Sequence, residues 1–196
     1  MVLGTEAHLD YFSLVMPSLQ NYVGDPVNCS LRGHWTKLFN PSNNAIEVTL
    51  IPPIHSPLLV KILSGISIAT VVLAGLWYCR KASVDLSHAL AWVVMLLASP
   101  IAWDHYLILL VFPLILIWRN LGPGSRWGIL LLILIICVQA RNPYSHPSEG
   151  VIRTFHWPFT VTILSYQTYA LLATGLWMVF LIRHEDRPPK NLPDEA

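Results

Sequence analysis

Charged residues are scarce in this chain. They make up 12% of its 196 residues, whereas hydrophobic residues make up 54%. An average soluble domain has about 25% charged residues. The formal net charge is +1, so the chain lacks the basic field with which proteins bind nucleic acid. The composition therefore argues against a nucleic-acid partner and favours the lipid bilayer as the solvent for most of the chain.

Cysteine and closely spaced histidine are scarce too. The three cysteines, Cys29, Cys79 and Cys137, form no CxxC pair, and no two histidines have HxxxH spacing. We therefore predict no disulfide framework, no metal site and no cofactor. The first twelve residues lack the basic flank and apolar core of a signal peptide. Membrane insertion would then depend on a later span or on an upstream segment.

Long apolar runs follow a polar segment at residues 1–56. A helix needs about 20 apolar residues to cross the hydrocarbon core of a bilayer. The runs predict an all-α polytopic membrane domain at residues 57–183, with about five embedded helices, some of them short. We place these spans at residues 57–79, 84–99, 104–118, 126–140 and 158–182, followed by a tail at 184–196.

Basic residues near the span ends predict the orientation, because cytoplasmic loops are rich in lysine and arginine. If the spans alternate in direction, one face carries Arg80, Lys81, Arg119, Arg126 and Arg183. We predict that this face and the C-terminus are cytoplasmic in a multi-pass cell-membrane protein. Residues 1–56, the turn at 99–105 and the loop at 141–157 would then lie outside.

The sequence SPIAWDHY, residues 99–106, interrupts the longest apolar tract. Pro100 removes a backbone donor and disfavours helix at Ser99, so the helix should break there. Asp104 and His105 then begin the next span. Ionisable residues at membrane depth cost roughly 2 to 3 kcal/mol each and usually serve function. The alternative interpretation is that Asp104 only caps the helix.

Asp104 and His105 are therefore candidate catalytic residues. The imidazole could protonate a leaving oxygen, bind phosphate or ligate a metal. Because the neighbouring spans are short, either the bilayer thins locally or their outer ends line a wet cavity, and we favour the cavity. Cationic groups from the outer segments could clamp an anionic headgroup there. The candidates for that role are Arg32, Lys37, Arg141 and Arg153.

Two segments resemble glycosyltransferase family 87, the polyprenol-phosphate-mannose-dependent mannosyltransferases of bacterial envelopes. LLASPIAWDHYLILLVFPL, residues 96–114, is similar to the family signature. VNCSLRGHWTKLF, residues 27–39, resembles an outer-loop pattern of Asn-Gln-Ser, then glycine, then arginine. In this pattern Asn28, Ser30 and Gly33 match, Cys29 replaces the glutamine, and Lys37 replaces the arginine.

The resemblance implies the C-terminal half of a GT-C type inverting transferase. Such an enzyme moves a hexose from a polyprenyl-phosphate donor to an envelope lipid or glycan acceptor. It would place His105 at the transfer centre, with Asp104 orienting it or positioning the sugar. Trp103 and Tyr106 would lie against a sugar ring or lipid. Asn28, Ser30 and Lys37, which lie in the second motif, would bind substrate together with the outer-loop cations Arg141 and Arg153.

The catalytic aspartate of the family lies on an earlier outer loop that has no counterpart here. We therefore expect an N-terminal half to be missing from this chain. A transporter remains an alternative, because the broken tract could form a discontinuous helix pair. It would need polar residues continuing towards the cytoplasm, and the last span offers them only at residues 165–169. A non-catalytic membrane assembly subunit is the other alternative.

Overall fold

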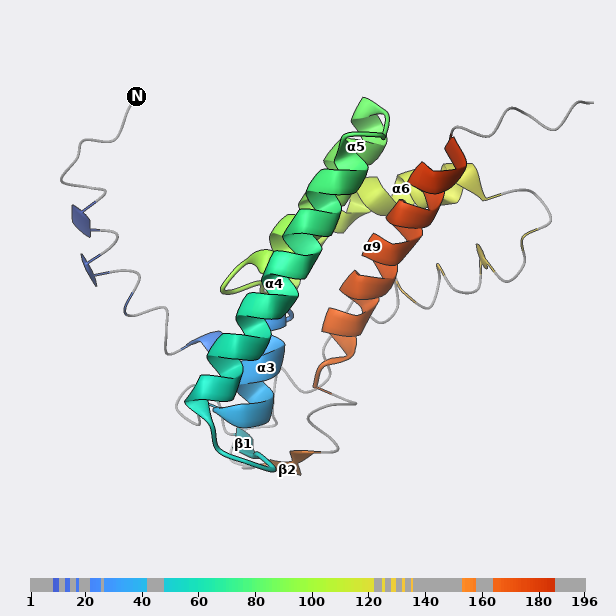
Figure 1. Ribbon diagram of the computed structural model, residues 1–196. Coiled ribbons are helices and arrows are strands. Elements are labelled where there is room, and N and C mark those ends of the chain that lie inside the picture. The colour runs from blue at the N-terminus through green and yellow to red at the C-terminus, as the bar shows by residue number, and fades with distance from the viewer. Residues whose placement is uncertain are drawn as a thin grey trace, which may run out of the picture.

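The computed structural model describes residues 9–10, 13–14, 17, 22–25, 27–41, 48–121, 125, 128–129, 132, 135, 153–157 and 164–185. This part of the chain is mostly helical, in agreement with the predicted fold class (Figure 1). Its helices are α3 (Leu31–Phe39), α4 (Pro57–Cys79), α5 (Val84–Ala98), the 3-10 helix η2 (Asp104–Leu110), α6 (Val111–Asn120) and α9 (Tyr166–Glu185). Two short strands are β1 (Val48–Ile51) and β2 (Arg153–His156).

Helix α4 has the bounds predicted for the first membrane span. Among the described residues, this 23-residue helix is the one that is long and apolar enough to cross a membrane. The Ser56 hydroxyl caps it by accepting a hydrogen bond from the Leu59 N–H at 3.3 Å. Pro57 occupies the first helical position, where a backbone donor is not needed. Sequence signals at the helix start therefore explain where α4 begins.

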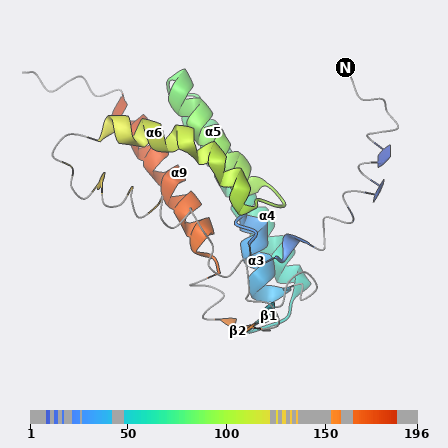
Figure 2. The same cartoon turned by 180° about the vertical axis from the view of Figure 1, so that it is seen from behind.

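Helix α5 packs against both α4 and α9. Gly75 on α4 faces Val94 of α5, and Gly175 on α9 faces Val93 of α5. Because neither glycine has a β-carbon, the helices approach closely at these two points. Helix α6 crosses α5 and α9 towards the end of the bundle that is remote from α3 (Figure 2).

The interruption that SPIAWDHY predicts is present. Helix α5 ends at Ala98, and the next helical turn begins at Asp104. The chain does not resume as an α-helix, because the first seven residues form η2 before α6 begins at Val111. Pro113 cannot donate to the Leu109 carbonyl, and this favours the tighter 3-10 winding ahead of it.

Strands β1 and β2 are an addition to the predicted all-α fold. They pair in parallel, with Val48 opposite Arg153 and Ile51 opposite His156. Each strand has four residues, too few for a sequence pattern to identify. Their pairing joins the N-terminal segment to the loop at residues 141–157. These are two of the segments that were predicted to share the outer face.

The remaining predicted spans correspond less closely to the structure. Most of the span predicted at 126–140 lies outside the described residues. The span predicted at 158–182 corresponds to α9, which begins at Tyr166 and continues to Glu185. Membrane crossing by α5, α6 and α9 stays a prediction.

Candidate functional site

The two segments with family-like motifs meet at the α3 end of the bundle (Figure 1). The buried Asn28 side chain joins them. Its amide group donates to the carbonyls of Val23 at 2.8 Å and Pro100 at 3.1 Å. Its Oδ1 accepts from the N–H groups of Ser30 at 3.1 Å and Ala102 at 3.0 Å. The amide of Asn28 thus uses both its donors and both its acceptor sites on backbone groups.

Cys29 and Ser30 extend this junction. The Cys29 N–H donates to the Ala102 carbonyl at 2.8 Å, and its thiol donates to the same oxygen at 2.7 Å. The Ser30 hydroxyl caps α3 by accepting from the Gly33 N–H at 3.0 Å, and it donates to the Pro100 carbonyl at 3.4 Å. The start of α3 is therefore fixed to the turn that follows α5.

Gly33 is required by this arrangement. A β-carbon at this position would lie 2.6 Å from Nδ2 of Asn28, closer than real contacts allow. The absence of a side chain lets Asn28 lie against the first turn of α3. The sequence motif contains both Asn28 and Gly33. The structure shows that the Asn28 side chain fits in its place because Gly33 has no side chain.

Lys37 lies beneath the junction and is 1% exposed. Its ammonium group donates to the carbonyls of Asn28 at 3.0 Å and Leu164 at 2.7 Å. Burial lowers the pKa of Lys37 to about 8, and the nearby Cys29 and Asp25 oppose that shift. Lys37 thus ties α3 to the segment just before α9. The ammonium group of Lys37 is therefore not on the surface, where a substrate phosphate would first contact the protein.

His34 is a buried residue that the sequence did not single out. Its ring packs edge-on against Trp35 at 4.9 Å and Tyr169 at 5.6 Å between ring centroids. Burial, together with the positive charge of Lys37, lowers the pKa of His34 to about 4. Its imidazole is therefore neutral at neutral pH. His34 and Lys37 are three residues apart on α3, a spacing that places both on one helical face.

An aromatic cluster lies beside the junction and consists of Tyr22, Trp103, His105 and Tyr106. The Trp103 and Tyr106 rings are stacked, with centroids 6.4 Å apart and planes 5° apart. Tyr22 meets Trp103 edge-on at 6.1 Å, and His105 lies 4.3 Å from Tyr106. His105 and Tyr106 are exposed. Asp104 begins η2 behind the N-cap residue Trp103, and its side chain lies outside what the structure describes.

A cavity of about 370 Å³ adjoins this cluster where α5 ends and η2 begins. Trp103, Tyr106 and Ser99 contribute to its otherwise apolar lining. Among the described residues, neither His105 nor a basic side chain lines this cavity. A cavity that includes His105 stays a prediction, and this neighbouring cavity lies to one side of that histidine. It is also more apolar than we expected.

The structure describes the other predicted site residues, Arg141 and Arg153, only in part. Arg141 lies outside the described residues, and Arg153 belongs to β2 with its side chain outside them. In the described part of the chain, no three His, Cys, Asp or Glu side chains gather as metal ligands do.

Comparison with known proteins places the chain in no family, because no family model, curated protein or solved structure matches it. The resemblance to glycosyltransferase family 87, whose motifs are at residues 27–39 and 96–114, stays a prediction.

Proposed function

We propose that this chain is part of a membrane glycosyltransferase that moves a hexose from a polyprenyl-phosphate donor to an envelope lipid or glycan acceptor. One observation carries the proposal. The segments at 27–39 and 96–114, which separately resemble family 87, are hydrogen-bonded to each other through Asn28, Cys29 and Ser30. Two motifs of one enzyme are expected to converge on one site.

Membrane insertion is the first part of this proposal. Large apolar side chains are exposed on each long helix, as at Leu58 and Leu73 on α4, Met95 on α5, Ile115 on α6 and Leu176 on α9. Soluble proteins rarely expose large apolar patches, whereas lipid-facing helices expose apolar side chains by necessity. The composition and the positions of the basic residues support the same proposal.

The aromatic cluster would form the sugar-binding surface. In the proposed reaction an acceptor hydroxyl attacks the anomeric carbon, and the bond from that carbon to the donor phosphate oxygen breaks. The hydroxyl proton passes to a carboxylate base, and polyprenyl phosphate leaves. His105 would donate a hydrogen bond or a proton to the departing phosphate. Trp103 and Tyr106 would stack against the sugar or the first part of the lipid.

Asn28 and Lys37 have a different role in this proposal from the one suggested by the motif. Their polar groups are occupied by backbone partners inside the protein. We propose that they position residues 100–106 and do not contact the donor. Ser30 acts in the same way through its contact with Pro100.

A non-catalytic membrane subunit is the second candidate. The observation that favours it is the lining of the cavity beside Trp103, which has no basic side chain among the described residues. Such a subunit would be needed for assembly or stability but would not take part in the chemistry.

Transfer assays with source membranes separate these candidates. The measurement is hexose transfer from a polyprenyl-phosphate donor, with the gene expressed from its own locus. His105→Ala is expected to lower transfer by about 100-fold or more, as the loss of a general acid does. The control His55→Ala changes another exposed histidine, which precedes α4. Undiminished transfer by His105→Ala would rule out the catalytic role and favour the subunit.

A further inference from the structure

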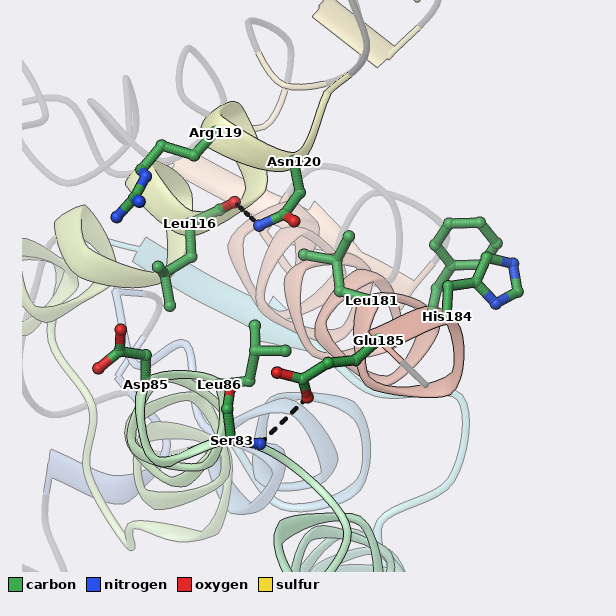
Figure 3. Close-up of a pocket in the computed structure, with 10 residues that line it drawn as sticks. Ser83, Asp85, Leu86, Leu116, Arg119, Asn120, Leu181, His184 and Glu185 are labelled. Carbon is green, nitrogen blue, oxygen red and sulfur yellow. Dashed lines mark hydrogen bonds between the residues drawn. The ribbon is translucent and has the colours of Figure 1, made fainter. Parts of the chain in front are cut away.

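A second cavity, of about 410 Å³, lies at the end of the bundle remote from α3. It forms where α5 begins and where α6 and α9 end. Figure 3 shows Arg119 and Asn120 of α6 on one rim, and Ser83, Asp85 and Glu185 on the opposite rim. Leucine side chains lie between the two rims. The cavity is thus polar at its edges and apolar between them.

Charges of both signs are available in this cavity. Arg119 and Asp85 are exposed, and neither forms an ion pair with another residue that the structure describes. One carboxylate oxygen of Glu185 accepts a hydrogen bond from the Ser83 N–H at 3.0 Å. Glu185 therefore keeps further acceptor sites. Among the described residues that line it, the cavity has one guanidinium group, two carboxylates and the imidazole of His184, and no ion pair joins Arg119 to Asp85 or Glu185.

An apolar cavity of about 500 Å³ continues from this one. The two share Asn120, Phe180 and Leu181. The second cavity extends along α9 past Leu176 and Trp177. A charged chamber therefore opens into an apolar groove along a helix. This pairing complements a molecule that has a charged head and a hydrocarbon chain.

We infer that these joined cavities bind a phospholipid whose headgroup contains both a phosphate and a primary amine. The guanidinium of Arg119 would receive the phosphate, and Asp85 and Glu185 would receive the ammonium group. A primary ammonium group can donate hydrogen bonds to carboxylates, whereas a quaternary one cannot. Two carboxylates also disfavour a headgroup whose net charge is negative. An acyl chain would occupy the groove along α9.

The inferred site rests on the membrane insertion proposed above but not on sugar transfer. By the predicted topology it lies at the cytoplasmic interface, at the depth of the lipid headgroups. Trp118, at the end of α6, is 56% exposed, as expected of an aromatic residue at that depth. The sugar-transfer site would lie at the other end of the same helices.

Lipid retention by the purified full chain tests the inference. The chain is mixed in detergent with equal amounts of phosphatidylethanolamine, phosphatidylcholine and phosphatidylglycerol of matched acyl chains, and bound lipid is measured by native mass spectrometry. We expect a preference for phosphatidylethanolamine. Arg119→Gln and Asp85→Asn should each weaken its binding about tenfold, the equivalent of one charge-assisted hydrogen bond. Arg80→Gln is the control, because Arg80 is an exposed cation at the same end of the bundle that does not line the cavity.

Equal retention of the three lipids by the unmodified chain would overturn the inference, and this result does not depend on whether any variant folds. An equal loss of binding in Arg80→Gln and Arg119→Gln would also overturn it. His105→Ala is expected to retain phosphatidylethanolamine while losing sugar transfer. The inference and the proposed function can therefore fail separately.

Discussion

The ammonium group of Lys37 donates a hydrogen bond to the Leu164 carbonyl at 2.7 Å, although 127 residues separate the two in sequence. The same ammonium group donates to the Asn28 carbonyl. One buried charge thereby connects α3, the turn before α3 and the segment that leads into α9. The consequences of this burial can be measured through the dependence of stability on pH.

Alkaline pH should stabilise the folded chain through Lys37. Its pKa is about 8 in the folded state and 10.5 in the reference state, so the unfolded chain binds more protons between these values. The free energy of unfolding should therefore rise between about pH 8 and pH 10.5, by up to about 3 kcal/mol. Thermal unfolding in detergent micelles is the measurement. Lys37→Met should remove this rise, whereas Lys61→Met, at an exposed position on α4, should retain it.

Acidic pH should destabilise the chain through His34. Its folded-state pKa of about 4 lies below the reference value of 6.5. Between these values the unfolded chain binds more protons, so stability falls as the pH is lowered from about 6.5 towards 4. His34→Phe should flatten this part of the curve in the same unfolding measurement. His55→Phe, at an exposed position, should leave it unchanged, and an equal flattening would contradict the prediction.

Asn28→Ala should detach α3 from the turn at residues 100–102. It removes four hydrogen bonds and leaves buried backbone groups without partners, at an expected cost of about 3 kcal/mol. Hydrogen exchange at the Ala102 amide should accelerate by more than tenfold. Asn120→Ala is the matched control, because within the described part of the chain that side chain donates to the Leu116 carbonyl of its own helix. Unchanged exchange at Ala102 would show that the junction does not depend on Asn28.

Gly33→Ala should be strongly destabilising, whereas Gly65→Ala should not. A β-carbon at Gly33 would overlap the buried Asn28 side chain, while one at Gly65 would meet nothing within 4 Å. Overpacking of this kind costs roughly 1 to 3 kcal/mol, and alanine in an open helical position is favoured over glycine by up to about 1 kcal/mol. The difference in melting temperature between the two variants tests the prediction. Equal melting temperatures would contradict it.

Local signals in the sequence predicted several parts of the structure. The apolar run after Ser56 indicated the start of α4. Pro100 indicated the break after α5. Trp103 and Tyr106 were named together because both belong to the motif SPIAWDHY, and the start of η2 stacks their rings. Hydropathy and proline act over a few residues, so one sequence is enough to detect them.

The sequence by itself thus determined a helical, strongly apolar chain and the place where its longest tract breaks. Only the tertiary structure showed that Lys37 is buried, that β1 pairs with β2, and that the ends of α5, α6 and α9 enclose charges of both signs. Each of these depends on contacts between residues far apart in sequence. The sequence around a lysine or a four-residue strand does not indicate which distant residue it will contact. That partner is determined only when the whole chain packs.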